Sequence, residues 1–378
     1  GRVTAVYRKQ RLPNYTVFDE ERYFEPGREA CVIDVDGLAC GIIVCEDLWF
    51  DGPAAQARAA GARCLVVANG SPYHTRQQTL RREQAAARAG ETGLPIIYVN
   101  RVGGQDELVF DGASFVTDAG GQVVQQLPAW HETVALASFD GAVPRPVRGG
   151  LESRLEAQVY PALVMVVRDY VRKNRFPGVI IGLSGGIDSA LTLAVAVDAL
   201  GRDAVRAVMM PSPYNAPISL EDARTMAGLT GVRYDEIPIA PMMGAFEESL
   251  AAELAGRTPD ATEENIQARI RGTLLMALSN KSGSIVLTTG NKSETAVGYS
   301  TLYGDLAGGF AVIKDILKTL VYRLCRYRNS VAPVIPERIL TRAPSAELKA
   351  GQTDQDSLPP YDVLDAIVEH YMEEGQSI

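Results

Sequence analysis

Val179-Ile180-Ile181-Gly182-Leu183-Ser184-Gly185-Gly186-Ile187-Asp188-Ser189-Ala190 decides the fold of the second half of this chain. An apolar strand, Val179–Leu183, runs into a Ser-Gly-Gly turn, and a helix over Ala190–Leu200 follows almost at once. The two glycines let the backbone approach a ligand closely and adopt angles that are closed to other residues. The N–H groups at the start of the helix attract an anion, as does the helix dipole. The segment therefore predicts a loop that binds phosphate.

A plain strand-to-helix turn, with Ser or Asp as the helix cap, is the alternative for this segment. The segment has neither the Gly-x-x-x-x-Gly-Lys-Ser/Thr spacing of a conventional P-loop nor the Gly-x-Gly-x-x-Gly spacing of a dinucleotide fold. Ser184 and Ser189 add hydroxyl groups. Asp188 adds a negative charge, which would repel a phosphate unless a divalent cation lies between them. The pattern favours a nucleotide bound together with Mg²⁺.

Strands and helices alternate on both sides of this loop, which is typical of a doubly wound α/β fold with a parallel sheet. The predicted strands are Val179–Leu183, Val205–Met210, Tyr234–Ile239 and Ser284–Thr288. The predicted helices are Leu151–Lys173, Ala190–Leu200, Leu220–Leu229 and Thr262–Ser279.

The first half also shows an α/β pattern, with strands at Ala39–Val44, Cys64–Ala68 and Leu94–Val99 and helices at Pro53–Gly61 and Gln77–Ala89. Beyond Asn100 the segments become short, and we predict antiparallel hairpins with glycine turns. The predicted turns are Gly103-Gly104, Asp111-Gly112 and Gly120-Gly121. A Pro- and Gly-containing linker is predicted at 144–150, between domains at 1–143 and 151–378.

The composition excludes several classes of protein. A chain of 378 residues exceeds the usual size of one domain. Its 37 Lys and Arg against 46 Asp and Glu give a net charge of −9, which argues against nucleic acid as a partner. No apolar run reaches the roughly 18 residues needed to span a bilayer, so no membrane partner is expected. Five cysteines without a Cys-x-x-Cys pair favour a reducing, cytoplasmic location.

Ser184–Ser189 resembles the loop of the N-type ATP pyrophosphatases, which activate a substrate by adenylylation and release pyrophosphate. GMP synthetase, asparagine synthetase, tRNA-thiolating enzymes and NAD synthetase share this loop. Three further segments closely resemble the synthetase domain of the glutamine-dependent NAD synthetases, and the resemblance covers nearly all of 151–378. These segments are Glu264–Arg269, Thr288–Asp305 and Arg342–Tyr361.

The resemblance implies an adenine nucleotide alpha hydrolase-like fold for this half, and it assigns site residues within it. ATP would be bound by Gly182, Leu183, Ser184, Gly185, Gly186, Ile187, Asp188, Ser189, Thr289, Lys318 and Ser345. Deamido-NAD⁺ would be bound by Asn265 and Glu294, and Mg²⁺ by Asp188 and Glu294. For each residue taken singly, a solvated or capping side chain is the alternative.

Cys45 is the candidate nucleophile of the first half, because it ends an apolar strand. A cysteine attacks as the thiolate, so it needs a nearby cation or base, and Lys9, His74 or His131 could supply one. Taken alone, Cys45 is more simply a small buried hydrophobic residue.

The segments Tyr7–Tyr15 and Gly41–Trp49 resemble the nitrilase-type amidase domain of the same synthetases, whose triad is Glu-Lys-Cys. Lys9 and Cys45 match its lysine and cysteine, and the triad Glu is expected on a part of the chain before Lys9. Tyr15 and Ser71 match glutamine-binding positions. The third such position, usually Lys, is Gln77 here, beside Arg76.

The resemblance implies a ligase that uses ATP, Mg²⁺, glutamine and deamido-NAD⁺ to make NAD⁺, AMP, pyrophosphate and glutamate. It also implies a protected ammonia route and a homo-oligomer, an octamer in the family. The family pattern continues beyond Ile378 with a basic helix, so we expect a fragment of a longer chain. Two alternatives stay open: another enzyme with the same loop, such as a tRNA thiolase or GMP synthetase, and a non-catalytic remnant that binds nucleotide.

Overall fold

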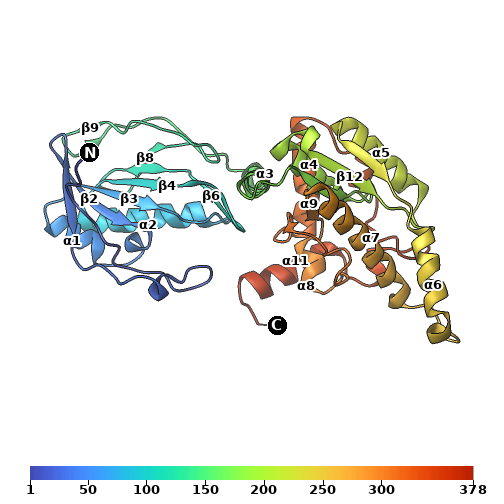
Figure 1. Cartoon of the computed structure of the whole chain (residues 1–378). Helices are drawn as coiled ribbons and strands as arrows, with labels where there is room; N and C mark the ends of the chain where they lie inside the picture. Colours follow the sequence, from blue (N-terminus) through green and yellow to red (C-terminus); the bar gives the residue numbers. More distant parts are fainter. Residues whose placement is uncertain (378) are drawn as a thin grey trace. The chain divides into compact units, whose positions relative to one another are not determined.

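A computed structural model describes residues 1–377, and the chain divides into two compact units, Gly1–Gln158 and Val159–Ile378 (Figure 1). Both units are α/β, which confirms the predicted fold class. The linker predicted at 144–150 lies shortly before the boundary between the units, and it remains a proposal. No helix within residues 1–377 is long and apolar enough to cross a membrane.

The first unit is built on a six-stranded sheet with the strand order β1-β2-β3-β4-β7-β8. Its three central strands, β2 to β4, are parallel, and the pairs β1/β2, β4/β7 and β7/β8 are antiparallel. The strands are β1 (Cys31–Val35), β2 (Leu38–Val44), β3 (Cys64–Asn69), β4 (Ile96–Asn100), β7 (Phe115–Thr117) and β8 (Val123–Gln126).

Two helices, α1 (Pro53–Ala59) and α2 (Gln77–Thr92), pack on this sheet through small side chains. Ala57 of α1 and Ala85 of α2 belong to one buried cluster with Leu65 and Ile96 of the strands. Burying a leucine or isoleucine contributes about 1.5–3 kcal/mol, and alanine lets the helix backbone come close to the sheet. The cluster fixes the ends of β2 and β3, where the first-half candidate residues lie.

Antiparallel hairpins of the first unit are present, but two of the three predicted turns are wrong. Asp111 lies in a strand and Gly112 forms an isolated bridge with Ala129, so Asp111-Gly112 is not a hairpin turn. Gly103-Gly104 lies inside strand β5 (Val102–Gln105), which pairs with β6 (Leu108–Asp111). The chain turns at Asp106, whose φ of +51° is one that aspartate tolerates better than most residues. Gly120-Gly121 does connect β7 and β8, as predicted. The remaining short elements are the 3₁₀ turns Glu20–Arg22 and Cys45–Leu48 and the strands β9 (Phe139–Asp140) and β10 (Val143–Pro144).

The second unit contains a parallel five-stranded sheet with the order β13-β12-β11-β14-β15. The strands are β11 (Val179–Gly182), β12 (Val205–Met209), β13 (Arg233–Glu236), β14 (Ile285–Thr288) and β15 (Phe310–Ala311). The chain runs outward from β11 to β13, then returns to the other side of β11 for β14. Open α/β sheets bind ligands at the carboxyl ends of the strands beside such a reversal. The loop at Ser184 lies at that point.

Three of the predicted helices, at Ala190–Leu200, Leu220–Leu229 and Thr262–Ser279, extend further than predicted, whereas the helix predicted at Leu151–Lys173 begins at Leu155. Five further α-helices are present among residues 1–377. The helices of the second unit are α3 (Leu155–Lys173), α4 (Ile187–Leu200), α5 (Pro217–Thr230), α6 (Ala240–Leu254), α7 (Ala261–Ser282), α8 (Lys292–Ala296), α9 (Lys318–Val331), α10 (Glu337–Thr341) and α11 (Tyr361–Val368). Short turns complete the unit at Arg202–Ala204, Asp354–Asp356 and Glu369–Glu373. Ile270 and Leu275 of α7 pack against Ile180 and Val286 of the sheet, so α7 covers one face beside the predicted phosphate loop.

Candidate active sites

One cavity of about 840 Å³ in the second unit is lined by every residue that the resemblance assigns to ATP, deamido-NAD⁺ or Mg²⁺. These residues come from the end of β11, the start of α4, the end of β14, α7, α8, the start of α9 and the segment around Ser345. Residues far apart in the chain therefore meet at the reversal point of the sheet.

The loop at 184–189 is braced by its own side chains. Ser184 Oγ accepts a hydrogen bond from the Gly186 N–H at 3.1 Å, and Ser189 Oγ donates to the Gly186 carbonyl at 2.9 Å. The two hydroxyls also lie 3.1 Å apart. Gly185 has a φ of +79°, and a Cβ there would lie 2.3 Å from the Ser219 carbonyl oxygen. The loop thus holds a shape that only glycine permits at this position.

Two carboxylates and one ammonium form the most strongly charged part of the cavity. Lys318 Nζ lies 2.6 Å from Asp188 Oδ2 and 2.9 Å from Glu294 Oε1. Burial and the nearby Asp188 raise the pKa of Glu294 to about 7, against the opposing effect of Lys318. Burial by itself would lower the pKa of Lys318, but the two carboxylates raise it above its ordinary value.

Asn291, which the sequence analysis did not assign, organises this group. Its Nδ2 donates to Asp188 Oδ1 at 3.0 Å, and its Oδ1 accepts from the Glu294 N–H at 2.9 Å, which caps α8. The side chain is fully buried. A single amide therefore holds the Asp188 carboxylate and the backbone of Glu294. Its position just after β14 is the sequence signal for an N-cap.

Arg271 of α7 is a second cavity residue that the sequence analysis missed. Its Nε donates to the Met210 carbonyl at 3.1 Å, and it forms no ion pair with any residue in 1–377. Burial lowers the pKa of its guanidinium to about 10. The charge of Glu347 offsets part of this desolvation cost, and an anion bound in the cavity would offset more of it.

Asn265 and Ser345 line the same cavity but are held by neighbours. Asn265 Oδ1 accepts from Thr301 Oγ1 at 2.7 Å, and Ser345 Oγ donates to the Gln352 carbonyl at 2.5 Å. Both side chains keep some exposure to the cavity. The segment around Ser345 is therefore folded over the cavity by its own hydrogen bonds.

Cys45 begins the turn directly after β2, with a φ of +49°. Burial raises the pKa of its thiol, while the Gly70 backbone and the charge of Lys9 oppose that rise. Asp47 of the same turn ties the Lys9 segment to it, since its carboxylate accepts from the N–H groups of Gln10 at 3.0 Å and of Arg11 at 2.8 Å. The structure thus brings the predicted lysine and cysteine together.

Glu20 and Glu46 are carboxylates beside this thiol that the sequence analysis did not assign. Glu20 accepts from Lys9 Nζ at 2.6 and 2.8 Å, and Glu46 accepts from the Tyr15 hydroxyl at 2.9 Å. Burial raises the pKa of Glu46 above its ordinary value. No pattern in the sequence marks either residue, because both contacts depend on how the loop before β1 folds back.

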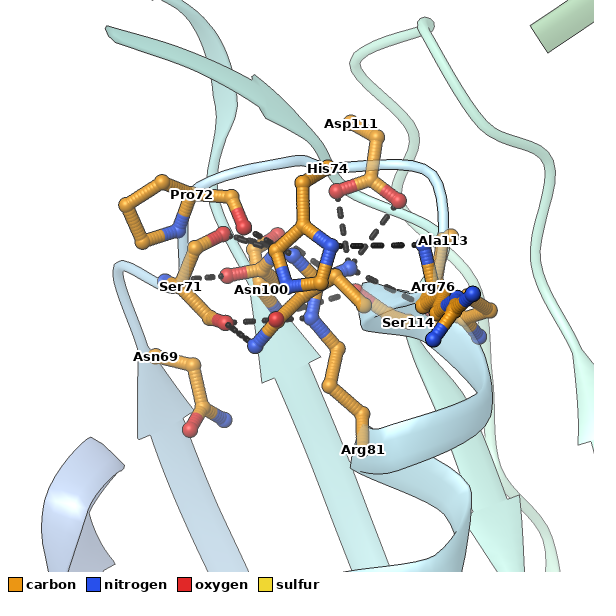
Figure 2. Close-up of polar contacts among 12 residues, drawn as sticks. Asn69, Ser71, Pro72, His74, Arg76, Arg81, Asn100, Asp111, Ala113 and Ser114 are labelled. Atoms are coloured by element: carbon orange, nitrogen blue, oxygen red, sulfur yellow. Dashed lines mark hydrogen bonds and ion pairs between the residues drawn. The ribbon is translucent and has the colours of Figure 1, made fainter. Parts of the chain in front are cut away.

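The loop with Ser71 is held by one fully buried arginine (Figure 2). Arg81 donates from Nε to Ser71 Oγ at 3.1 Å and from Nη2 to the Ser71 carbonyl at 2.7 Å. Its Nη1 pairs with Asp111 at 2.8 Å. Gln77 Nε2 also donates to Ser71 Oγ, at 3.1 Å, and His74 Nδ1 accepts from the Arg76 N–H in the same loop. The predicted serine and Gln77 therefore lie side by side.

Comparisons with known proteins match both units. Residues 159–378 match the NAD synthase family and residues 1–148 the carbon-nitrogen hydrolase family. The glutamine-dependent NAD(+) synthetase of Acinetobacter baylyi is 49% identical over 381 residues, which cover 100% of this chain and 70% of that protein. The glutamine-dependent NAD(+) synthetase of Thermotoga maritima is 45% identical over 413 residues, which cover 99% of this chain and 72% of that protein. The glutamine-dependent NAD⁺ synthetase of Acinetobacter baumannii, solved with ADP, is 46% identical, with a TM-score of 0.87 over 100% of this chain and 70% of that one.

Replacing Gly185 by alanine is expected to weaken ATP binding by about tenfold or more, because the new Cβ displaces the loop from Ser219 and strains the backbone. Calorimetric titration with ATP measures the change. Gly228→Ala, where a Cβ meets no atom within 4 Å, is the matched control and should bind ATP normally. Equal ATP affinity in Gly185→Ala and the unchanged protein would contradict the phosphate-loop assignment.

Arg271→Met is expected to weaken nucleotide binding by about tenfold without lowering the melting temperature, because it removes a half-buried cation of the cavity that forms no ion pair within residues 1–377. Titrations with ATP and with deamido-NAD⁺ identify which ligand loses affinity. Arg224→Met, outside the cavity, should leave both affinities unchanged. A lower melting temperature with unchanged affinities would mean that Arg271 is only structural.

Arg81→Met is expected to lower the free energy of unfolding of the first unit by about 3–5 kcal/mol, because it leaves the Asp111 carboxylate buried and unpaired. Urea unfolding followed by fluorescence measures this. The double variant Arg81→Met/Asp111→Leu removes both charges and should recover much of the loss. A single variant as stable as the parent would rule out this role for the pair.

Proposed function

Because this chain belongs to the glutamine-dependent NAD(+) synthetases, we propose that its two sites divide one reaction, the amidation of deamido-NAD⁺ to NAD⁺. The enzyme is a ligase that takes its nitrogen from glutamine. In our proposal the thiol site releases ammonia and the cavity of the second unit activates the carboxylate that receives it. The observation that carries the proposal is the cavity itself, which gathers the phosphate loop, two carboxylates and the cations Lys318 and Arg271.

In the cavity, the start of α4 and its glycine loop receive the phosphates of ATP. The ADP bound to the Acinetobacter baumannii relative supports the use of an adenine nucleotide here. The carboxylate oxygen of deamido-NAD⁺ attacks the α-phosphorus of ATP, and pyrophosphate leaves. Ammonia then attacks the activated carboxyl carbon, and AMP leaves with the two electrons of the broken carbon–oxygen bond. Adenylylation is needed because a free carboxylate has no adequate leaving group.

Magnesium is part of the proposal, and the residues present fit it. Among residues 1–377 no three His, Cys, Asp or Glu side chains gather to hold a metal by themselves. Mg²⁺ is usually bound through one or two carboxylates together with substrate phosphates, and Asp188 and Glu294 supply such a pair. When bound, Mg²⁺ neutralises phosphate charge. Asn291 holds Asp188 in place for this role.

At the thiol site, the sulfur of Cys45 forms a bond to the amide carbon of glutamine, and the carbon–nitrogen bond breaks. Ammonia leaves with the proton that the thiol has lost, and water then releases glutamate from the thioester. Lys9 stabilises the negative charge that develops on the amide oxygen, and Glu20 holds the Lys9 ammonium in place. Tyr15, Ser71 and Gln77 form the proposed glutamine contacts. The general base is expected on a segment that precedes Lys9.

The proposal extends to the assembly and the location of the enzyme. Ammonia released into water would become protonated and lose its nucleophilicity, so a protected route within a homo-oligomer, an octamer by the resemblance, is proposed. All five cysteines are free thiols, in keeping with a cytoplasmic location.

The intact enzyme with Cys45→Ala is expected to lose NAD⁺ formation from glutamine and to keep NAD⁺ formation from ammonium salts, because only the first reaction needs the thiol. Cys31→Ala, a half-buried cysteine of β1, is the matched control and should keep both reactions. The assay follows NAD⁺, AMP and pyrophosphate with each nitrogen donor. Loss of both reactions in Cys45→Ala, or of neither, would contradict this division of labour.

A further inference from the structure

Lys318 occupies a site between two acidic groups that a metal would also occupy. Its ammonium lies within 2.9 Å of both Asp188 and Glu294, and only 2% of its side chain is exposed. The second oxygen of Asp188 is already bonded to Asn291. Asp188 Oδ2 and Glu294 Oε1 therefore share one cation, which is the ammonium of Lys318.

The backbone at Lys318 is fixed, whereas its long side chain has rotatable bonds through which the ammonium can be redirected when another cation takes its place. The Lys318 N–H donates to Ser293 Oγ at 2.8 Å, and the next N–H, of Thr319, donates to Asp365 Oδ2 at 2.8 Å. The Tyr361 ring centroid lies 5.1 Å from Nζ. A lysine carries its charge on a flexible four-carbon stem, so the ammonium can change partners while α9 stays in place.

Two cations cannot share this position. Mg²⁺ and an ammonium repel each other, and each would need the same carboxylate oxygens at close range. Without any cation, two carboxylates in a largely buried site would repel each other strongly. The lysine therefore stabilises the nucleotide-free site and at the same time blocks entry of a metal. The phosphates of ATP are negatively charged like the two carboxylates, so they offer the Lys318 ammonium a second hydrogen-bond partner.

We propose that Lys318 is a built-in counter-ion that holds the metal position in the nucleotide-free protein and transfers to the ATP phosphates when Mg²⁺ enters. This inference rests on the proposed metal pair, Asp188 and Glu294. The exchange makes metal and nucleotide binding interdependent. Each ligand must then tighten the binding of the other by the same factor, because binding free energies are reciprocally linked. Lys318 is a positioning residue in this account as well as a phosphate contact.

Binding of Mn²⁺ to the intact protein, followed by the electron paramagnetic resonance signal of the free ion, tests the proposal. Without nucleotide, Lys318→Met is expected to bind Mn²⁺ about tenfold or more tightly than the unchanged protein, a factor in the usual range of coupling between sites. With α,β-methylene-ATP present, corrected for the complex of Mn²⁺ with free nucleotide, the unchanged protein should gain Mn²⁺ affinity and Lys318→Met should gain much less.

Lys292→Met is the matched control. This neighbouring lysine pairs with Glu373 outside the cavity, so its loss should leave Mn²⁺ affinity unchanged. Because Lys318→Met leaves two buried carboxylates without a cation, Lys318→Gln serves as a second variant. Thermal melting gives a second readout, in which Mn²⁺ alone should raise the melting temperature more in the Lys318 variants than in the parent.

The outcomes separate this inference from the proposed function. If the Lys318 variants bind Mn²⁺ no more tightly than the parent while Asp188→Asn abolishes binding, the counter-ion proposal is wrong and the metal site stands. If Asp188→Asn has no effect on Mn²⁺ binding, both the metal assignment and the counter-ion proposal fail. NAD⁺ formation from ammonium salts, assayed separately, reports on the proposed reaction in either case.

Discussion

The close approach of Asp188 and Glu294 inside one cavity is the constraint on which the synthetase half depends. Phosphates are anions, so a site that also holds two carboxylates needs cations in the right positions. The structure provides Lys318 between the acids, Arg271 on the opposing helix α7, and the positive end of α4 at the glycine loop. Asn291, just after β14, bonds to the Asp188 carboxylate at the start of α4 and to the backbone N–H of Glu294. Both acids therefore lie beside the point where the strand order reverses.

The thiol half is organised by buried polar side chains in a comparable way. Asp47 fastens the Lys9 segment to the Cys45 turn, and Arg81 with Asp111 fastens the Ser71 loop to the sheet. Both groups are largely or wholly removed from solvent, where satisfied hydrogen bonds and ion pairs give a defined geometry. These buried contacts therefore position the segments that carry Lys9 and Ser71.

The alternation of strands and helices and the glycine loop could be predicted from the sequence, because alternating apolar runs and a Ser-Gly-Gly turn are local signals. The residues assigned to the cavity came from the family resemblance, and the structure places them along one cavity. Contacts between segments that are far apart in the sequence could not be predicted from local signals. The pairing of Lys9 with Glu20 and the hydrogen bond from Asn291 to Asp188 depend on folds of the chain that no local pattern encodes. Gly103-Gly104 was predicted as a turn but lies in strand β5, because both residues pair with strand β6. Among the helices that were not predicted, α8 and α10 have only five residues each, whereas α9 is long and amphipathic and could have been found from its pattern.

The loop alone left several adenylylating enzymes possible, and the rest of the chain decides between them. Two family matches and relatives 45% and 49% identical along almost the whole chain select NAD synthetase over GMP synthetase and the tRNA thiolases. A non-catalytic nucleotide-binding remnant is disfavoured by the same relatives, which are named as synthetases.

A crystal structure of the intact protein with a non-hydrolysable ATP analogue and Mg²⁺ is the most direct test of the account. The account predicts the terminal phosphates against the backbone N–H groups between Gly185 and Ser189, with the Lys318 ammonium moved from the acids to a phosphate oxygen. A nucleotide bound elsewhere, with that loop still closed on its own side chains, would contradict it.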